Sequence, residues 1–286
     1  MKNEEEEMED EGLDEEMDED ENSNMLSKLQ SKVDDLEVKQ VDSRRIRIID
    51  QSKKRAAIES VFDERTLFLL NKILKNGPLS DIIGIISAGK EANVYLAHDQ
   101  EGEEVAVKIY KIDSNTSRWM RNYIIGDPRF KKIPHNVSKV IYLWASKEFK
   151  NLKRAHEAGL SVPKPIYIRN NILIMEYIGF DTIPAPKLKD IREPRNIDDL
   201  AAEIFKFIKD LYQKARLVHG DLSEFNILYH NQRPIVIDIS QAVDIRHPKA
   251  EVFLVRDIRN MINYFEKFEV ELPDPEKFYY EIINFE

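Results

Sequence analysis

An eight-residue segment in the last third of the chain restricts the possible folds more than any other feature. It reads His219-Gly220-Asp221-Leu222-Ser223-Glu224-Phe225-Asn226. A long amphipathic helix is predicted before it, over residues 198–215, and two short strands are predicted after it, over residues 227–229 and 235–239. Asp238 stands near the end of the second predicted strand. A loop between a helix and a hairpin would display these polar side chains close together.

Two carboxylates and one amide of this region suit phosphoryl transfer. That reaction needs a carboxylate to orient the attacking group and oxygen ligands that hold Mg²⁺ against the phosphates. Asp221 is the candidate for the first task, and Asn226 and Asp238 are the candidate metal ligands. The pattern therefore predicts ATP as substrate and Mg²⁺, or Mn²⁺, as cofactor. The alternative is a surface loop beside a turn, with no chemistry.

A lysine on a predicted strand and a glutamate on a predicted helix form a candidate pair. Lys108 ends an apolar run that begins at Val105, as the strand lysine of a kinase nucleotide site does. Glu148 lies on the apolar face of the helix predicted over residues 136–158, four residues after Trp144. A carboxylate on a buried face is costly without a cation. We therefore expect the two side chains to pair at the nucleotide phosphates; the alternatives are a solvent-facing lysine and a glutamate at the edge of the face.

A turn ahead of the Lys108 strand is a candidate for phosphate contacts. It lies between strands predicted over residues 82–86 and 94–97 and contains one glycine. Free backbone N–H groups in such a turn can cover phosphates. The candidate residues are Ser87, Gly89 and Lys90, although the spacing alone would also fit an ordinary hairpin.

The strand predicted over residues 172–177 opens into a linker that could hold an adenine ring. Backbone groups of Glu176 and Ile178 are the candidates for its polar edge, with Met175 behind the base. A methionine that only fills the core is the alternative for Met175.

The order of predicted elements indicates an α+β fold. A helix over residues 63–75 precedes the strands, and the second half of the chain is mainly helical. The predicted elements are helices over 63–75, 136–158, 198–215, 251–265 and 275–283, and strands over 82–86, 94–97, 105–110, 166–168, 172–177, 227–229 and 235–239. A small strand-rich lobe followed by a helical lobe leaves a cleft between them as the expected site.

The charge of the chain is unevenly distributed. The formal net charge is −10, but residues 1–22 hold fourteen Asp or Glu and one Lys, while the remainder has 42 Lys and Arg against 39 Asp and Glu. A block of like charge with few apolar residues cannot bury surface, so we expect a disordered acidic tail over residues 1–25 and a charged extension over 26–59. The tail either keeps the protein soluble or competes with nucleic acid for a basic face.

Several classes of function are excluded or disfavoured by composition. The chain has no cysteine, which excludes disulfides and thiolate zinc sites. The sequence contains no apolar run of membrane-spanning length, and its acidic N-terminus does not resemble a signal peptide. We expect a cytoplasmic protein without a membrane partner.

With these residues in view, the chain resembles the RIO family of atypical serine protein kinases, most closely its first subgroup. The resemblance covers roughly residues 60–285 and implies a two-lobed protein-kinase-like fold with an N-lobe of about 80–178 and a reduced C-lobe of about 179–286. The segments that carry it are Ser87 to Tyr95, Leu217 to Leu228, Ile237 to Gln241, His247-Pro248 and Phe253 to Asp257.

The same segments depart from ordinary protein kinases. Gly220 stands where the arginine of H-R-D is usual, Ser223 replaces a lysine, and Asp238-Ile239-Ser240 replaces D-F-G. No A-P-E segment follows. An activation segment and peptide-docking helices therefore have little room.

The resemblance implies a role in maturation of the small ribosomal subunit. It implies ATP turnover that gates association with pre-ribosomal particles and their RNA, autophosphorylation on serine, and a phospho-aspartate at Asp238. It also implies that residues 111–136, a long polar insertion, form a mobile loop, in which Ser114, Thr116 or Ser117 could accept phosphate. His219, His247 and Asp257 are expected to be structural, with Asp257 holding the backbone of the catalytic loop.

Two other functions fit the same residues. A small-molecule phosphotransferase of the aminoglycoside or choline kinase type also uses a His-x-Asp loop, but usually carries a larger helical substrate subdomain. A nucleotide-sensing binding module with slow turnover would need the same site for release from RNA or protein.

Overall fold

The computed structural model describes residues 47–48 and 62–285. All of them belong to Arg45–Glu286, the second of the two units into which the chain divides. The acidic tail predicted over residues 1–25 lies outside the described residues. So does the extension predicted over 26–59, apart from a two-residue strand, and both stay predictions.

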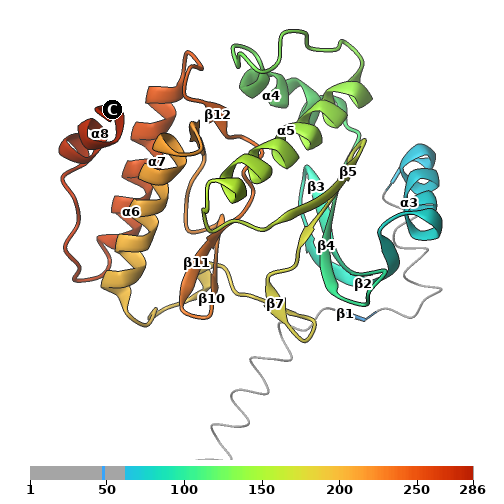
Figure 1. Cartoon of the computed structure of the whole chain (residues 1–286), viewed down its shortest axis with the longest axis horizontal. Coiled ribbons are helices and arrows are strands. Elements are labelled where there is room, and N and C mark those ends of the chain that lie inside the picture. The colour runs from blue at the N-terminus through green and yellow to red at the C-terminus, as the bar shows by residue number, and fades with distance from the viewer. Residues whose placement is uncertain (1–46, 49–61, 286) are drawn as a thin grey trace, which may run out of the picture. The chain divides into compact units, whose positions relative to one another are not determined.

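A six-stranded antiparallel sheet forms the first part of the described fold (Figure 1). Its order is β1-β2-β3-β4-β6-β5. The strands are β1 (Arg47–Ile48), β2 (Leu79–Ala88), β3 (Ala92–Asp99), β4 (Glu104–Tyr110), β5 (Pro165–Arg169) and β6 (Ile172–Glu176). β4 is paired on both sides and is buried from Val105 to Tyr110, so its sequence is apolar without the alternation of a half-exposed strand.

Helices cover both faces of this sheet. α3 (Glu64–Asn76) begins at Asp63, whose side chain accepts the Arg65 and Thr66 N–H groups, and packs against the face that carries Val105, Val107 and Ile109. Alternate residues of a strand point to opposite faces. Lys108 and Tyr110 therefore face the other side, where they contact α5 (Val137–Glu157).

The insertion between β4 and α5 contains a regular helix. α4 (Ser114–Ile124) is capped by Asp113 and buries Ser117, Met120 and Ile124. These positions follow helical spacing and pack with the apolar face of α5. The expectation of a long polar loop over residues 111–136 is therefore wrong for residues 114–124, because three small or apolar positions give this segment one buried face.

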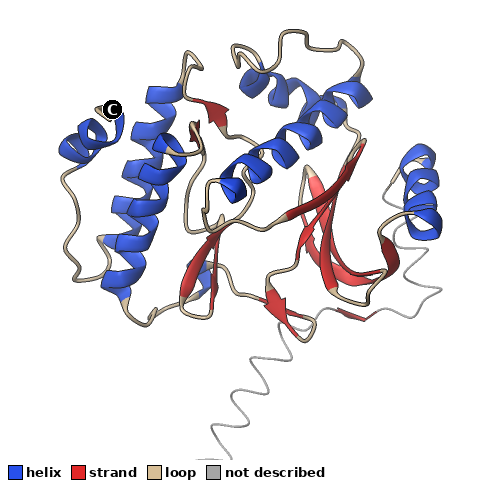
Figure 2. Cartoon of the chain, viewed as in Figure 1, coloured by secondary structure: helices blue, strands red, loops and turns tan. Residues whose placement is uncertain are grey.

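The second part is mainly helical, as Figure 2 shows. α6 (Ile197–Gln213), α7 (Ala250–Phe265) and α8 (Pro275–Ile283) lie against one another (Figure 1). The shorter elements are β7 (Gly179–Phe180), β8 (Ile183–Pro184), the 3₁₀ helix η1 (Leu188–Asp190), β9 (Leu217–Val218), β10 (Ile227–His230), β11 (Arg233–Val236) and β12 (Val243–Asp244). β9 pairs with β12, and β10 pairs with β11.

The α+β class is confirmed, with a strand-rich lobe followed by a helical one. One boundary differs at a site residue. The strand predicted over residues 235–239 ends at Val236, because Asp238 adopts φ +62°, in the left-handed region that ends a strand. Among the described residues, no helix is both long and apolar enough to cross a membrane.

Candidate active site

Lys108 lies between two carboxylates from distant parts of the chain. Its Nζ is 2.8 Å from Glu148 Oε1 and 2.7 Å from Asp238 Oδ1. The Glu148 side chain is 1% exposed, whereas that of Asp238 is 50% exposed. The predicted pairing of Lys108 with Glu148 is confirmed. Asp238, the third member of this cluster, connects the sheet and α5 to the segment that follows β11.

The charge of this lysine is stabilised despite its burial. Burial alone would lower the pKa of Lys108, but the carboxylates of Asp238 and Glu148 outweigh it and hold the pKa well above its usual range. Lys108 in turn lowers the pKa of Asp238. The Tyr110 hydroxyl donates a hydrogen bond to the other oxygen of Glu148. The site therefore presents an ammonium group beside an ionised, half-exposed carboxylate.

The loop that carries Asp221 is held by a buried aspartate of α7. Asp257 Oδ2 accepts the Gly220 N–H at 2.7 Å, and Asp257 Oδ1 accepts the Leu222 N–H at 2.9 Å. Gly220 has φ +80°, a conformation that costs a residue with a Cβ atom. This explains why glycine stands where the arginine of H-R-D is usual. The structural role predicted for Asp257 is confirmed.

Asp221 is half-buried and held by a side chain from the segment after Asp238. Gln241 Nε2 donates to Asp221 Oδ2 at 2.9 Å. Burial raises the pKa of Asp221, while Arg256 and the Gln241 hydrogen bond oppose that rise. A carboxylate held in one orientation, with a raised pKa, suits the acceptance of a proton from a hydroxyl group.

Asn226 and Asp238 offer a donor set that fits Mg²⁺. The Asn226 amide nitrogen donates to the Asp221 carbonyl at 2.9 Å, so its Oδ1 stays available as a ligand. Asp238 adds a carboxylate oxygen not used by Lys108. Mg²⁺ in nucleotide sites commonly takes one or two protein oxygens, with phosphates and water completing its octahedron. The described residues contain no group of three acidic or histidine side chains placed for a metal.

Two histidines stabilise loops around the site. His219 is buried, its Nε2 lies 3.4 Å from Ile237 O, and burial lowers its pKa to about 4. His247 accepts the Lys249 N–H at Nδ1 and donates from Nε2 to Ile125 O at 2.9 Å. Both rings contact backbone groups, in agreement with the structural roles predicted for them.

All three predicted phosphate-binding residues are exposed, with Ser87 near the end of β2 and Gly89 and Lys90 in the β2–β3 turn. The Gly89 N–H donates to Ala92 O at 3.0 Å, so this amide is engaged within the turn rather than free for a phosphate. An added Cβ at Gly89 would lie 2.9 Å from the same oxygen. Nucleotide contacts by this turn stay a prediction.

The same turn contains Glu91, whose carboxylate has no role in the sequence prediction. Burial, followed by the negative charges of Asp238, Glu148 and Asp221, raises the pKa of Glu91 to about 7, with Lys108 opposing them. Glu91 is therefore a fourth acidic group near this site.

The two residues predicted to contact adenine through their backbone, Glu176 at the end of β6 and Ile178 in the linker that follows, differ in side-chain exposure. The Glu176 side chain is exposed and accepts the Lys164 N–H at 3.0 Å. Ile178 is buried, and its carbonyl accepts the Ala185 N–H. Met175 is half-buried against the core, which leaves both interpretations of this methionine open.

Comparison with known proteins identifies the family. Residues 93–278 match the RIO domain. The chain belongs to the RIO family. Its relatives include the RIO-type serine/threonine-protein kinase Rio1 of Haloferax volcanii, which is 41% identical over 228 residues, with 79% of this chain and 77% of that protein covered. The protein of the same name from Methanocaldococcus jannaschii is 38% identical, with 86% and 84% covered. These matches support the Rio1 subgroup.

Other relatives are longer than this RIO-family chain. The human serine/threonine-protein kinase RIO1 is 38% identical over 250 residues, and the match spans 86% of this chain but 44% of the human protein. Among solved structures, the Rio2 kinase of Chaetomium thermophilum in an ADP/Mg²⁺-phosphoaspartate complex matches with a TM-score of 0.58 at 24% identity, over 74% of this chain and 63% of that one. This likeness shows the protein-kinase-like fold.

Residues that sequence reasoning missed contact the predicted site directly. Tyr110 could have been found, because it stands two residues after Lys108 and therefore on the same face of β4. Gln241 belongs to the segment that carries the family resemblance, but nothing in its spacing indicates a contact with Asp221, twenty residues earlier.

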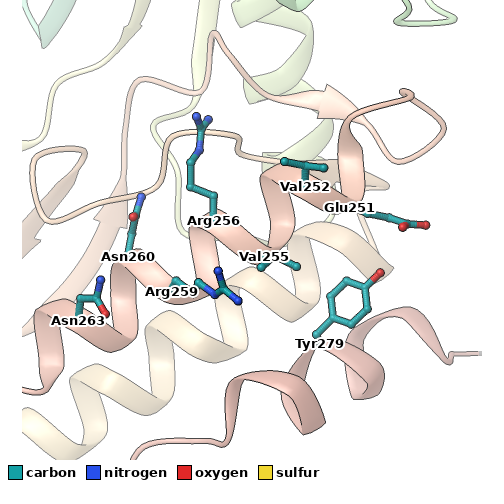
Figure 3. Close-up of a pocket in the computed structure, with 8 residues that line it drawn as sticks. All are labelled: Glu251, Val252, Val255, Arg256, Arg259, Asn260, Asn263 and Tyr279. Atoms are coloured by element: carbon teal, nitrogen blue, oxygen red, sulfur yellow. The ribbon is translucent and has the colours of Figure 1, made fainter.

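A shallow surface cavity of about 700 Å³ lies on α7 beside the catalytic loop of this RIO-family chain (Figure 3). Asn260 in its lining donates to Leu222 O at 3.0 Å. Arg256 points from α7 toward the loop, and its Nε and Nη2 are buried without a hydrogen-bond partner in the described part of the chain. The cavity is separate from the predicted nucleotide residues. It is lined by Glu251, Val252, Val255, Arg256, Arg259, Asn260, Asn263 and Tyr279.

Proposed function

We propose that this RIO-family protein is a Mg²⁺- and ATP-dependent serine/threonine kinase that also hydrolyses ATP. One observation carries the proposal: Lys108, from the sheet, and Asp221, from the helical lobe, are held to the segment 238–241 through Asp238 and Gln241. The names of the relatives, serine/threonine-protein kinase Rio1, support the same activity.

Each residue has a chemical task in this proposal. Lys108, held by Glu148, binds the α- and β-phosphates of ATP through its ammonium group. Asn226 and Asp238 hold Mg²⁺, which neutralises charge on the phosphates. Asp221 accepts the proton of a serine hydroxyl group. The serine oxygen attacks the γ-phosphorus, and ADP leaves. Phosphoryl transfer depends mainly on such positioning and electrostatics.

Hydrolysis of ATP has two possible routes at the same site. Water can replace the serine hydroxyl and receive the phosphoryl group directly. Alternatively, an Asp238 oxygen attacks the γ-phosphorus, ADP leaves, and water then cleaves the acyl phosphate to release inorganic phosphate. The half-exposed side chain of Asp238 is compatible with the second route.

We further propose that turnover serves as a switch in small ribosomal subunit maturation. The family resemblance supports this role, with pre-ribosomal particles and their RNA as partners and the protein itself as a serine substrate. Among the three acceptor candidates, Ser114 is exposed at the start of α4, Thr116 is partly exposed, and Ser117 is buried. Ser114 is therefore the preferred acceptor.

A single-turnover reaction with γ-labelled ATP and Mg²⁺ tests the enzymatic proposal. We expect label on serine, on a hydroxylamine-sensitive acyl phosphate, or in released phosphate. Asp221→Asn and Asp238→Asn should each abolish turnover, and Asp221→Asn should leave ATP binding nearly unchanged. The matched control is Asp199→Asn, an exposed aspartate of α6. Tight ATP binding without transfer or release by the wild-type protein would contradict the proposal.

The ribosomal role needs its own test. Binding to small-subunit RNA should weaken steeply with salt, because contacts to phosphates release counterions. It should also differ between ATP-bound and ADP-bound protein. Equal affinity in both nucleotide states would remove the switch while leaving the kinase proposal intact.

A further inference from the structure

A second buried lysine, Lys147 on α5, lies next to Glu148 in the chain, and its hydrogen bonds within the described residues go to backbone carbonyls. Lys147 directly precedes Glu148 and is 0% exposed. Its Nζ donates to Ser240 O at 2.7 Å and to Ala242 O at 2.5 Å, and it lies 5.1 Å from the centre of the Trp144 ring. Burial lowers the pKa of this amine well below its usual range. Burying a lysine amine costs free energy. The hydrogen bonds that Lys147 donates to these two carbonyl groups therefore indicate its role.

A buried asparagine one turn further along α5 bonds to the same segment. Asn151 is 0% exposed, and its Nδ2 donates to Ile239 O at 2.9 Å and to Ala242 O at 3.0 Å. Together with Lys147 it satisfies three of the four carbonyls of residues 239–242. α5 therefore holds the main chain of this segment by hydrogen bonds to its carbonyl groups.

An arginine from the loop before α5 fixes the orientation of that asparagine. Arg129 Nη1 donates to Asn151 Oδ1 at 2.6 Å, so the amide nitrogen must face the carbonyls. The guanidinium also bonds at 2.8 and 2.6 Å to both oxygens of the buried Asp127 and at 3.3 Å to Ala242 O. We call Arg129, Lys147 and Asn151 the carbonyl clamp.

The segment held by the clamp connects the two catalytic carboxylates. Asp238 immediately precedes it and contacts Lys108, and Gln241 within it contacts Asp221. The left-handed backbone of Asp238, with φ +62°, is a conformation that only a well-determined surrounding structure maintains.

We propose that the carbonyl clamp positions Asp238 and Asp221 for phosphoryl transfer, so that α5 aligns both carboxylates with the lysine held by Glu148. This inference rests on the proposed function. The three clamp residues are positioning residues, because they act on substrate and metal only through the segment 239–242. Glu148 and Lys147, adjacent on one helix, then connect nucleotide binding and metal binding to a single rigid element.

The test is Lys147→Met, which keeps an unbranched side chain one atom shorter than lysine and removes both donated hydrogen bonds. We expect the Mg²⁺ concentration for half-maximal turnover to rise about 10- to 100-fold, the range seen when groups that orient metal ligands are removed. Turnover at saturating Mg²⁺ should also fall. ATP binding measured in EDTA should change less than about threefold. Lys153→Met is the matched control, since Lys153 is an exposed lysine of the same helix.

The outcomes separate the clamp from the proposed function. A wild-type protein without Mg²⁺-dependent turnover contradicts the proposed function itself. An active wild type together with a Lys147→Met protein of lower melting temperature but unchanged Mg²⁺ dependence overturns the clamp alone, because a purely structural lysine would affect only stability.

If Lys147→Met does not fold, the double variant Arg129→Gln/Asp127→Asn provides the measurement. The Asp127 side chain is 0% exposed, so neutralising it together with Arg129 avoids leaving a buried carboxylate unpaired. The same shift in Mg²⁺ dependence, in the same direction, is expected because Asn151 loses its fixed orientation. Unchanged Mg²⁺ dependence in this variant would overturn the proposal.

Discussion

Gln241 donates a hydrogen bond from Nε2 to Asp221 Oδ2 across 2.9 Å, from the segment after Asp238 to the loop after α6. The donor fixes the orientation of the proposed base and favours its ionised form. It also makes the position of Asp221 depend on the segment that carries Asp238.

Replacement of Gln241 by leucine should lower turnover about tenfold, with little change in ATP affinity, because the carboxylate loses its orientation. A bond to the ionised carboxylate lowers its pKa, so removing it raises the pKa of Asp221. Activity is lost as pH falls through that pKa, and the acidic limb of the pH–rate profile should move to higher pH. Gln213→Leu, outside the site on α6, is the control. An unmoved acidic limb would show that Asp221 does not determine it.

Lys108→Met should destabilise the fold as well as remove nucleotide binding. Glu148 would remain buried without its cation, and breaking a buried pair in this way costs about 3–5 kcal/mol. Urea unfolding at neutral pH measures the loss. The double variant Lys108→Met/Glu148→Gln should recover most of it, since no unpaired charge is left. A double variant no more stable than the single one would argue against an ionised Glu148.

His219 should make the protein sensitive to acid. Its folded pKa of about 4 lies below the ordinary value of 6.5, so between these values the unfolded chain binds a proton that the folded protein excludes. Its contribution to the free energy of unfolding is complete above about pH 6.5 and falls as pH decreases toward 4, by at most roughly 3 kcal/mol.

The comparison of wild type with His219→Gln measures this contribution. Stability of the variant should decline less over the same pH range. His156→Gln, an exposed histidine of α5, should follow the wild type. Parallel curves for wild type and His219→Gln would show that other groups cause the acid sensitivity.

Gly220→Ala and Gly159→Ala form a matched pair. Both glycines have a left-handed backbone, with φ +80° and +76°, and an alanine there costs roughly 1–2 kcal/mol. A Cβ atom added at Gly220 would lie 3.5 Å from the Phe253 ring, an ordinary contact distance. A Cβ atom added at Gly159 would have no neighbour within 4 Å. Chemical denaturation should therefore show similar losses.

Turnover should separate the two variants. Gly220 donates its N–H to Asp257 and precedes Asp221, so only Gly220→Ala should lower kcat. Equal turnover in both would mean that the catalytic loop tolerates the altered backbone.

Local sequence patterns were sufficient for most elements and for one contact of the site. The helical spacing in α5 gives the face of Glu148, and the apolar run that ends at Lys108 marks a buried strand. The cost of a buried charge then predicts their pairing. Asp257 was assigned to the catalytic loop by resemblance. The apolar face of α4 was also present in the sequence but was obscured by its many polar residues.

The sequence by itself determined most of the longer elements, the order of the site residues along the chain and the Lys108–Glu148 pair, because burial periodicity and charge pairing are local rules. Only the tertiary structure decided that Lys147 holds Ser240, that Gln241 holds Asp221 and that Asp238 leaves the strand. Those contacts depend on the register between elements up to about ninety residues apart. That register is set by the packing of whole faces, to which no single residue pattern corresponds.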